Sequence, residues 1–308
     1  MADATAGQVG ESGLIQAVVS RLGTAPQVLL GPGDDAAVLA APDGRVVATK
    51  DVLVEGVHFR RDWSTAYDVG RKAAAANLAD VAAMGGRGTA LLVGLCAPGD
   101  LPVDWALGLA DGLRDEGALV GAVVVGGDTV QAPQVVVSVT ALGDLQGRGP
   151  VTRSGARPGD VVVLAGVLGG AAAGLALLQA GQLAGALVDA HRRPRPPYDL
   201  GPVLADLGAT AMCDVSDGLV SDLGQLCAAS GVAAELDEAA VPAAEGASRA
   251  DVLHGGEDHA LLATVPLSAV EQLSRLGVVA VGRVRAGEGV HDLSGRRLQP
   301  AGWEHWGG

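Results

Sequence analysis

The stretch Val123-Val124-Val125-Gly126-Gly127-Asp128-Thr129 joins an all-apolar run to two glycines and an acid. A short, continuous apolar run is typical of a buried strand in a layered α/β structure. The carboxyl end of such a strand often faces a ligand, and glycines keep that end free of crowding side chains. We therefore expect a strand at 122–125 and a metal-binding carboxylate at Asp128, just beyond its end.

Strand and helix patterns continue on both sides of this stretch. The helix predicted at 65–84 begins with Thr65 and Asp68 as a capping box and ends at Gly85-Gly86. Further strands are expected at 45–50, 90–96, 135–141, 160–165, 211–215, 233–236, 260–265 and 278–284. Further helices are expected at 104–116, 170–180, 219–229 and 267–276, and 191–197 is a basic, proline-rich connector.

The length of 308 residues favours two domains, since a typical domain has about 100–200 residues. A loop rich in Gly, Arg and Pro runs from 143 to 159 and divides the strand and helix series. We place the boundary near residue 150, giving an N-terminal domain over 1–150 and a C-terminal domain over 151–308. The composition, 49% hydrophobic but 2% aromatic with 47 glycines, favours closely packed α/β layers.

The net charge of −14 comes from 21 basic and 35 acidic residues, and the lysines are Lys50 and Lys72. Nucleic-acid binding needs a basic surface, so we expect no nucleic-acid partner. An acidic protein that binds an anion must recruit cations or backbone dipoles to do so. A phosphate ligand would therefore be held mainly through metal ions.

Cysteine usage and hydropathy bear on the compartment. The three cysteines are far apart in the sequence and lack metal-ligand spacing, so we expect reduced core thiols in a cytoplasmic protein. The first twenty residues show no secretory signal. The uncharged stretch 161–188 is long enough to cross a bilayer, but its glycines and glutamines favour a buried strand, a turn and a helix instead.

Three motifs of the first half carry candidate ligands. The glycine loop at 31–38 holds Asp34 and Asp35, which suit a hard cation such as Mg²⁺, although a turn closed by Asp side chains is the alternative. Thr49-Lys50-Asp51 is expected at a strand end, followed by His58, which could contact a phosphate or be a satisfied half-buried residue. Asn77 and Asp80 share one helix face, either for a ligand or as a solvated surface.

Three motifs of the second half carry the remaining candidates. In 213–219, Asp214 and Ser216 share one side and Asp217 opens a helix, where it could equally be an N-cap. The turn 254–258 holds Glu257. The tail 302–306 contains Trp303 and Trp306, either packed onto the body or stacked over an aromatic ligand.

Taken in order, eight motifs closely resemble the thiamine-monophosphate kinase family: GPGDDAAVL, TKDVLVEGVHF, NLADVAAMG, GGDT, RSGARPGD, DVSDGLVSDLG, GGEDHALL and GWEHW. The match runs from about residue 11 to 306. The order makes the set specific, although each motif alone is not. No P-loop and no protein-kinase motif set is present in the sequence.

The resemblance implies a fold, an assembly and an activity. The family belongs to the aminoimidazole ribonucleotide synthetase superfamily, whose members build the site across a homodimer and hold ATP with several Mg²⁺ ions. This implies a two-domain mixed α/β fold, with an N-terminal sheet domain for ATP, Mg²⁺ and dimerisation and a C-terminal domain that completes the site. The implied reaction is ATP-dependent, Mg²⁺-assisted in-line phosphorylation of thiamine monophosphate to thiamine diphosphate. We expect no membrane partner for the protein.

The resemblance also assigns roles to residues. The metal positions are Asp35, Thr49, Asp51, Asp80, Asp128, Asp214 and Asp217, of which Asp128, Asp214 and Asp217 are the catalytic set. The ATP positions are Gly127, Asp128, Arg153 and Ser216. The thiamine-phosphate positions are His58, Glu257 and Trp303. Lys50 replaces a small hydroxyl residue and Val120 replaces an aromatic, which puts one metal contact and one adenosine contact in doubt.

Two other classes of function remain open. Other ATP-using enzymes of the superfamily often carry an N-terminal reactive Cys or a C-terminal Cys, and this sequence has neither. A magnesium- or nucleotide-sensing module without turnover is the second alternative, which an assay for ADP release would test.

Overall fold

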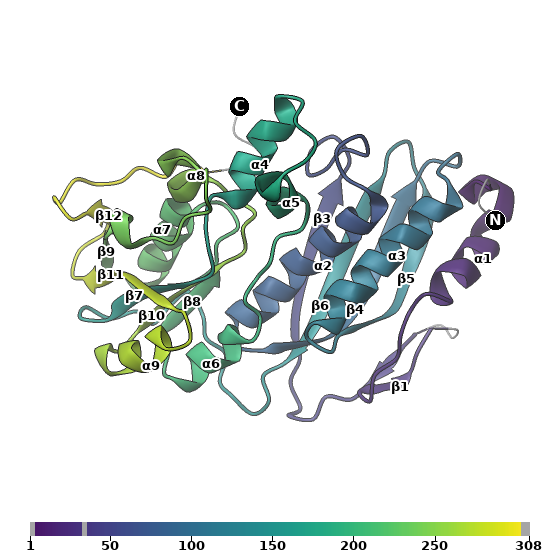
Figure 1. The fold of residues 1–308 in the computed structure, drawn as a ribbon. Helices are drawn as coiled ribbons and strands as arrows, with labels where there is room; N and C mark the ends of the chain where they lie inside the picture. Colours follow the sequence, from purple (N-terminus) through teal and green to yellow (C-terminus); the bar gives the residue numbers. More distant parts are fainter. Residues whose placement is uncertain (1–3, 33–35, 303–308) are drawn as a thin grey trace. The chain divides into compact units, whose positions relative to one another are not determined.

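The computed structural model describes residues 4–32 and 36–302, and it divides into two compact units (Figure 1). Unit 1 comprises Met1–Val81 and Arg87–Gln146, and unit 2 comprises Ala82–Gly86 and Gly147–Gly308. The mixed α/β class predicted from the sequence is confirmed. The change of unit between Gln146 and Gly147 falls within the glycine-rich loop.

Unit 1 is built on a four-stranded mixed sheet with the order β3-β6-β4-β5. Its strands are β3 (Val47–Val54), β4 (Arg87–Ala97), β5 (Val123–Gln131) and β6 (Val136–Asp144). Only β4 and β5 are parallel among these neighbours. The helices α2 (Ala66–Ala83) and α3 (Val103–Ala118) cover one face (Figure 1), where Val137, Val139 and Ala141 are fully buried.

All four strands extend beyond their predicted ends, and in β3 and β5 the extension changes where candidate ligands lie. β3 continues to Val54, so Thr49 and Asp51 lie within the strand rather than at its end. β5 has a register shift at Val125 and continues to Gln131, so Asp128 also lies within a strand. A β-bulge adds one residue without ending the strand, and the glycines after Val125 hid this continuation.

The N-terminal part of unit 1 contains α1 (Ala6–Val19) and β1 (Val28–Leu30), which the sequence did not predict, and β2 (Val38–Leu39), the short strand expected after the glycine loop at 31–38. Helix α1 begins with a capping box between Thr5 and Gln8 and is kinked at Gly10, whose φ is +68°. The two-stranded sheet of β1 and β2 follows. These elements are short or interrupted, which weakens their hydrophobic periodicity.

The capping box predicted at the start of α2 is present, because Thr65 and Asp68 exchange backbone and side-chain hydrogen bonds of 3.0 and 3.2 Å.

Glycines set the close crossing of α2 and α3. A Cβ on Gly70 would lie 2.2 Å from the carbonyl oxygen of Leu109, and a Cβ on Gly112 would lie 2.2 Å from that of Tyr67. Larger residues at 70 or 112 would therefore force the helices apart.

We expect Gly112→Ala to lower the free energy of unfolding by about 1–3 kcal/mol, because the methyl group overpacks a backbone contact. Gly224, a helical glycine with nothing within 4 Å of its Cβ position, provides the matched control. Gly224→Ala should stabilise by about 0.5–1 kcal/mol through helix propensity alone. Thermal melts of both variants test this, and an unchanged melting temperature for Gly112→Ala would contradict the crossing.

Unit 2 contains a six-stranded sheet with the order β12-β9-β11-β7-β10-β8. Its strands are β7 (Val161–Ala165), β8 (Ala211–Asp214), β9 (Ala233–Leu236), β10 (Leu261–Val265), β11 (Val279–Arg285) and β12 (Gly289–Asp292). Helix α7 (Leu219–Ser230) packs against strands of this sheet. Its core combines Leu219, Leu223 and Leu226 of the helix with Val162 and Leu164 of the sheet.

The remaining helices of unit 2 are short. They are α4 (Gly170–Gln179), α5 (Ala186–Arg192), α6 (Leu200–Asp206), α8 (Arg249–His254) and α9 (Val270–Ser274), with 3-10 turns at Glu238–Ala240 and Leu267–Ala269. The prediction of a connector at 191–197 is partly wrong, because its first two residues belong to α5. The helix predicted at 267–276 is split into a 3-10 turn and α9. No helix within the described ranges is long and apolar enough to cross a membrane.

Candidate functional site

The first set of candidate ligands lies where β3 meets α2 in unit 1. The Thr49 hydroxyl donates to Asp80 Oδ2 at 2.6 Å, and the Asp51 backbone N–H donates to Asn77 Oδ1 at 3.0 Å. Asn77 is fully buried and also donates to the Ala73 carbonyl at 2.9 Å. The solvated-face alternative is therefore wrong for Asn77, which ties the strand to the helix.

Strand alternation separates Lys50 from these ligands. Thr49 and Asp51 share the helix-facing side of β3, while Lys50 is exposed on the opposite side. Lys50, which replaces the small hydroxyl residue of the family pattern, thus lies on the face of the sheet opposite to Thr49 and Asp51.

His58 lies after β3 in a defined tautomer. The Val54 backbone N–H donates to His58 Nδ1 at 3.0 Å. A neutral ring that accepts at Nδ1 carries its proton on Nε2, which can donate to an anionic ligand. The buried Lys72 of α2 donates through Nζ to the His58 carbonyl at 3.2 Å and so ties this turn to the helix.

Asp128 lies at the opposite edge of the same sheet. Its side chain is exposed and accepts from the Thr129 N–H at 2.8 Å. Cross-strand pairing places Asp51 and the neighbouring Gly127 in one row of the sheet, on the outer strands β3 and β5. Three interstrand spacings separate these strands, or about 14 Å. One copy of unit 1 therefore holds two separate groups of candidate ligands.

Gly127 has a structural reason that is independent of any ligand. A Cβ at this position would lie 1.9 Å from the Val93 carbonyl oxygen on β4. The glycine is required by the close approach of the two strands. Its predicted contact with ATP stays a prediction.

The second set of candidate ligands follows β8 in unit 2. Asp214 ends the strand and is 3% exposed, while Ser216 and Asp217 are half-buried in the loop before α7. Asp217 does not cap α7, because Gly218 holds that position and no side-chain cap bond forms. The N-cap alternative for Asp217 is therefore wrong.

Asp222 closes this loop from within α7. Its Oδ2 accepts from the backbone N–H groups of Ser216 and Asp217, both at 3.0 Å. The carboxyl group is 1% exposed, and burial raises its pKa to about 7, opposed by these hydrogen bonds. Its role is to hold the loop that presents Ser216 and Asp217.

The glycine turn at 254–258 is bonded directly to this loop. The Glu257 N–H donates to the Ser216 carbonyl at 2.9 Å, and a Cβ on Gly256 would lie 2.3 Å from the same oxygen. Glu257 is half-buried, and its Oε2 lies 3.7 Å from Nδ1 of the buried His191. The turn and the loop, about forty residues apart in the sequence, thus form one structural unit.

Asp258 and His259, which follow Glu257 in the chain, form hydrogen bonds with the start of α4 and with Asp214. Asp258 accepts from the N–H groups of Gly169 and Ala171 at 2.6 and 2.8 Å, at the start of α4. His259 Nδ1 lies 2.9 Å from Asp214 Oδ2, and both residues are buried. Neither residue was among the predicted ligands, although both belong to the GGEDHALL motif.

Arg153 is exposed beside β8, to which its segment is joined by a hydrogen bond from the Met212 N–H to the Thr152 carbonyl at 3.0 Å. Burial raises the pKa of the Cys213 thiol well above its usual value, and the Arg153 side chain opposes this rise. Arg153 therefore lies next to the strand that ends in Asp214.

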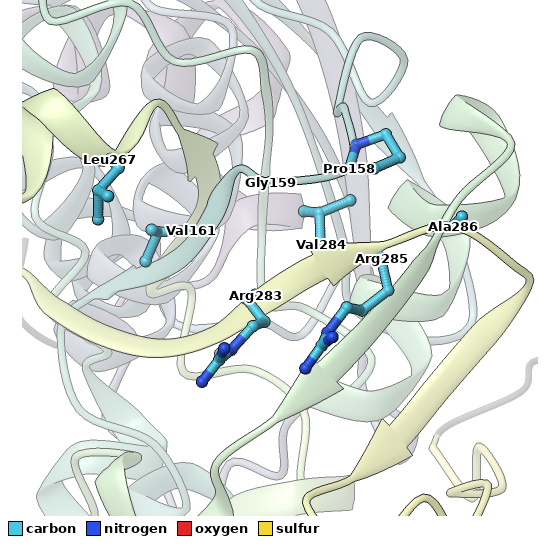
Figure 2. A pocket seen from close by; sticks show the side chains of 9 residues that line it. Pro158, Gly159, Val161, Leu267, Arg283, Val284, Arg285 and Ala286 are labelled. Atoms are coloured by element: carbon cyan, nitrogen blue, oxygen red, sulfur yellow. The ribbon is translucent and has the colours of Figure 1, made fainter.

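A separate hollow of about 640 Å³ lies along β11 (Figure 2). Arg283 and Arg285 extend in the same direction at its edge, and Arg285 pairs with Glu235. None of the residues predicted as ligands lines this hollow.

The donor set is compatible with magnesium. Within the described residues no group of three or more His, Cys, Asp or Glu converges on a metal position. Mg²⁺ is usually held by one or two carboxylates together with substrate phosphates and water, not by a complete protein cage. Pairs of oxygen ligands such as Thr49 with Asp80 fit this requirement.

Comparison with known proteins identifies the family. The models for the AIR synthase related protein N-terminal and C-terminal domains match residues 33–145 and 157–292. Thiamine-monophosphate kinase of Mycobacterium tuberculosis (strain CDC 1551 / Oshkosh) is 46% identical over 97% of this chain and 92% of its own length. The chain belongs to the thiamine-monophosphate kinase family.

Solved structures of this family share the fold. The crystal structure of thiamine-monophosphate kinase from Stenotrophomonas maltophilia K279a superposes with a TM-score of 0.81, at 34% identity, over 93% of this chain and 96% of that one. The structure of AaThiL complexed with AMPPCP and TMP gives a TM-score of 0.80, at 33% identity, over 97% of each chain. The resemblance found in the sequence is confirmed.

Several family positions lie outside the described residues. They are Asp34, Asp35, Trp303 and Trp306. Val120, the second departure from the family pattern, is 7% exposed and follows α3 in unit 1.

Proposed function

We infer that this chain uses ATP to phosphorylate thiamine monophosphate, giving thiamine diphosphate and ADP. The observation that carries this conclusion is the 46% identity to thiamine-monophosphate kinase over 97% of the chain. The related AaThiL was solved with AMPPCP and TMP. AMPPCP is an analogue of the donor of this reaction, and TMP is its acceptor.

The main obstacle to the reaction is electrostatic. Donor and acceptor are both polyanions, and the protein itself carries a net charge of −14. Bound Mg²⁺ would neutralise the phosphates and help align donor and acceptor. The metal positions we propose are Asp35, Thr49, Asp51, Asp80, Asp128, Asp214 and Asp217.

The protein supplies donors and rigid positions around these carboxylates. Proposed nucleotide contacts are Gly127, Asp128, Arg153 and Ser216, and Arg153 would provide a fixed positive charge for phosphate. His58 would contact the acceptor phosphate through Nε2, because Nδ1 accepts from the Val54 N–H. Glu257 would contact the cationic thiamine moiety.

Trp303 is the remaining proposed contact to the acceptor. The last described residue before it, Gly302, lies against the loop of unit 2, where a Cβ would be 1.9 Å from the Asp217 carbonyl oxygen. This contact supports a role for the tail near the candidate ligands. An aromatic ring there would attract the cationic thiazolium by about 0.5–2 kcal/mol.

We also propose a homodimer. The sheet face opposite α2 and α3 exposes Val52 (42%) and Leu92 (38%), an unusual position for apolar side chains on a strand surface. A twofold axis parallel to the strands would place β3 of one protomer opposite β5 of its partner. Asp128, which shares a cross-strand row with Val52, would then lie opposite β3 of the partner, whereas Thr49 and Asp51 face α2 within their own chain.

Sedimentation at micromolar concentration tests this assembly, and we expect a dimer. Val52→Glu should shift the equilibrium toward monomer, because dimerisation would bury a charged side chain in an apolar interface. A fully active wild-type monomer would contradict the proposal.

The reaction itself is tested by incubating the protein with ATP, Mg²⁺ and thiamine monophosphate and separating the products by chromatography. Thiamine diphosphate and ADP should appear in equal amounts. ATP binding without ADP release would favour a non-catalytic nucleotide-binding module, and turnover of another acceptor would favour a different enzyme of the superfamily.

A further inference from the structure

A buried imidazole lies directly behind one of the candidate metal carboxylates. His259 Nδ1 is 2.9 Å from Asp214 Oδ2, and the two residues are 7% and 3% exposed. A carboxylate buried to this degree requires a hydrogen-bond donor. The imidazole N–H provides that donor from a different segment of the chain.

The backbone holds His259 in one place. Its φ of +54° lies in the left-handed region, which His, Asn and Asp adopt more readily than most residues. Its N–H donates to the Val215 carbonyl at 3.0 Å, one residue beyond Asp214. The backbone of His259 is thus bonded to the same loop that its ring supports.

Asp214 lies in an acidic environment. Asp217 follows in the same loop, and Asp222 closes the loop from α7. The imidazole is the hydrogen-bond partner that holds the Asp214 carboxylate in these surroundings. A bond to Oδ2 sets its rotamer and leaves Oδ1 available for another partner.

We propose that His259 is a positioning residue that orients Asp214 so that its second oxygen faces a divalent cation. This inference rests on the magnesium role in the proposed function. Mg²⁺ prefers oxygen ligands, so the imidazole acts through the carboxylate and is not itself a ligand. Groups that hydrogen-bond to metal ligands typically change metal affinity by about 10–100-fold when they are removed.

The test compares His259→Gly with His259→Asn in the full-length protein. Both residues tolerate a positive φ, but only asparagine places an N–H donor at the same number of bonds from Cα as Nδ1. His291→Asn, on the partly exposed strand β12, is the matched control. Binding of Mn²⁺ in the presence of AMPPCP is followed by electron paramagnetic resonance.

We expect His259→Gly to weaken Mn²⁺ binding by about 10–100-fold. His259→Asn should restore most of the affinity, and His291→Asn should match the wild type. Equal Mn²⁺ affinity in a folded His259→Gly variant would overturn the proposal and leave His259 as a packing residue. Loss of affinity in His259→Asn equal to that in His259→Gly would also overturn it.

A second measurement covers the case in which His259→Gly does not fold. In wild-type protein with ¹⁵N-labelled histidine, Mg²⁺ with AMPPCP should shift the His259 ring signals and leave those of His291 unchanged. No shift at His259 would contradict the proposal. If the wild type binds neither Mn²⁺ nor Mg²⁺, the metal role in the proposed function fails. If the wild type binds metal and the variants bind it equally well, only the role of His259 fails.

Discussion

Asp214→Asn and Asp128→Asn are each expected to lower kcat by about 10²–10³-fold, because each removes a fixed negative charge while keeping the size of the side chain. Asp214 is buried at the end of β8, and Asp128 is exposed on β5. The two variants therefore test the two units separately. Steady-state assays over a range of Mg²⁺ concentrations give kcat and the apparent Mg²⁺ affinity for each.

Glu271→Gln provides a control for the loss of one negative charge. Its side chain is 82% exposed on α9 and pairs with Arg275, which is none of the proposed ligands. Its kcat should equal that of the wild type. If Asp128→Asn and Asp214→Asn stay folded and retain near-normal rates at saturating Mg²⁺, these residues are not metal ligands.

Free thiamine is expected to be a far poorer acceptor than thiamine monophosphate, with kcat/KM lower by about 10²–10⁴-fold. The acceptor phosphate has a second pKa of about 6, so its oxygen is already an anionic nucleophile at neutral pH. The hydroxyl of thiamine would need a general base, which contributes about 10²–10⁴-fold where one is present. Assays with each acceptor at equal ATP and Mg²⁺ measure the ratio.

The same reasoning predicts a pH dependence. As the pH rises from 5 to 7, the acceptor phosphate loses its second proton and kcat/KM for thiamine monophosphate should increase, levelling off above the pKa of about 6. Equal turnover of thiamine and thiamine monophosphate, or a rate that falls over this pH range, would refute a mechanism in which the acceptor phosphate is its own nucleophile.

The sequence predicted most of the candidate site through its motifs. Asp51, Asp80, Asp128, Asp214 and Asp217 were each named from a short pattern of acids and glycines. His259 and Asp222 were missed, because their roles depend on contacts with other segments. His259 acts on a residue 45 positions away, and Asp222 accepts from the loop that precedes α7, a bond that depends on how the chain turns into the helix.

The roles of individual glycines also required the structure. Gly127 was expected to give a ligand access, which stays a prediction, and the structure adds a close approach to the Val93 carbonyl on β4. The glycines after Val125 indicated a strand end, whereas the ladder continues after the register shift. Local patterns record that a side chain is absent, and only the neighbouring strand shows what occupies the space.

The sequence by itself determined the mixed α/β class and the family, because apolar periodicity and ordered motifs are local properties of the chain. The tertiary structure alone decided which residues meet: Thr49 with Asp80, Asp51 with Asn77, and Asp214 with His259. It also placed Asp128 and Asp51 on opposite edges of one sheet. Strand order and register arise from packing between distant segments, and no local pattern in the sequence specifies them.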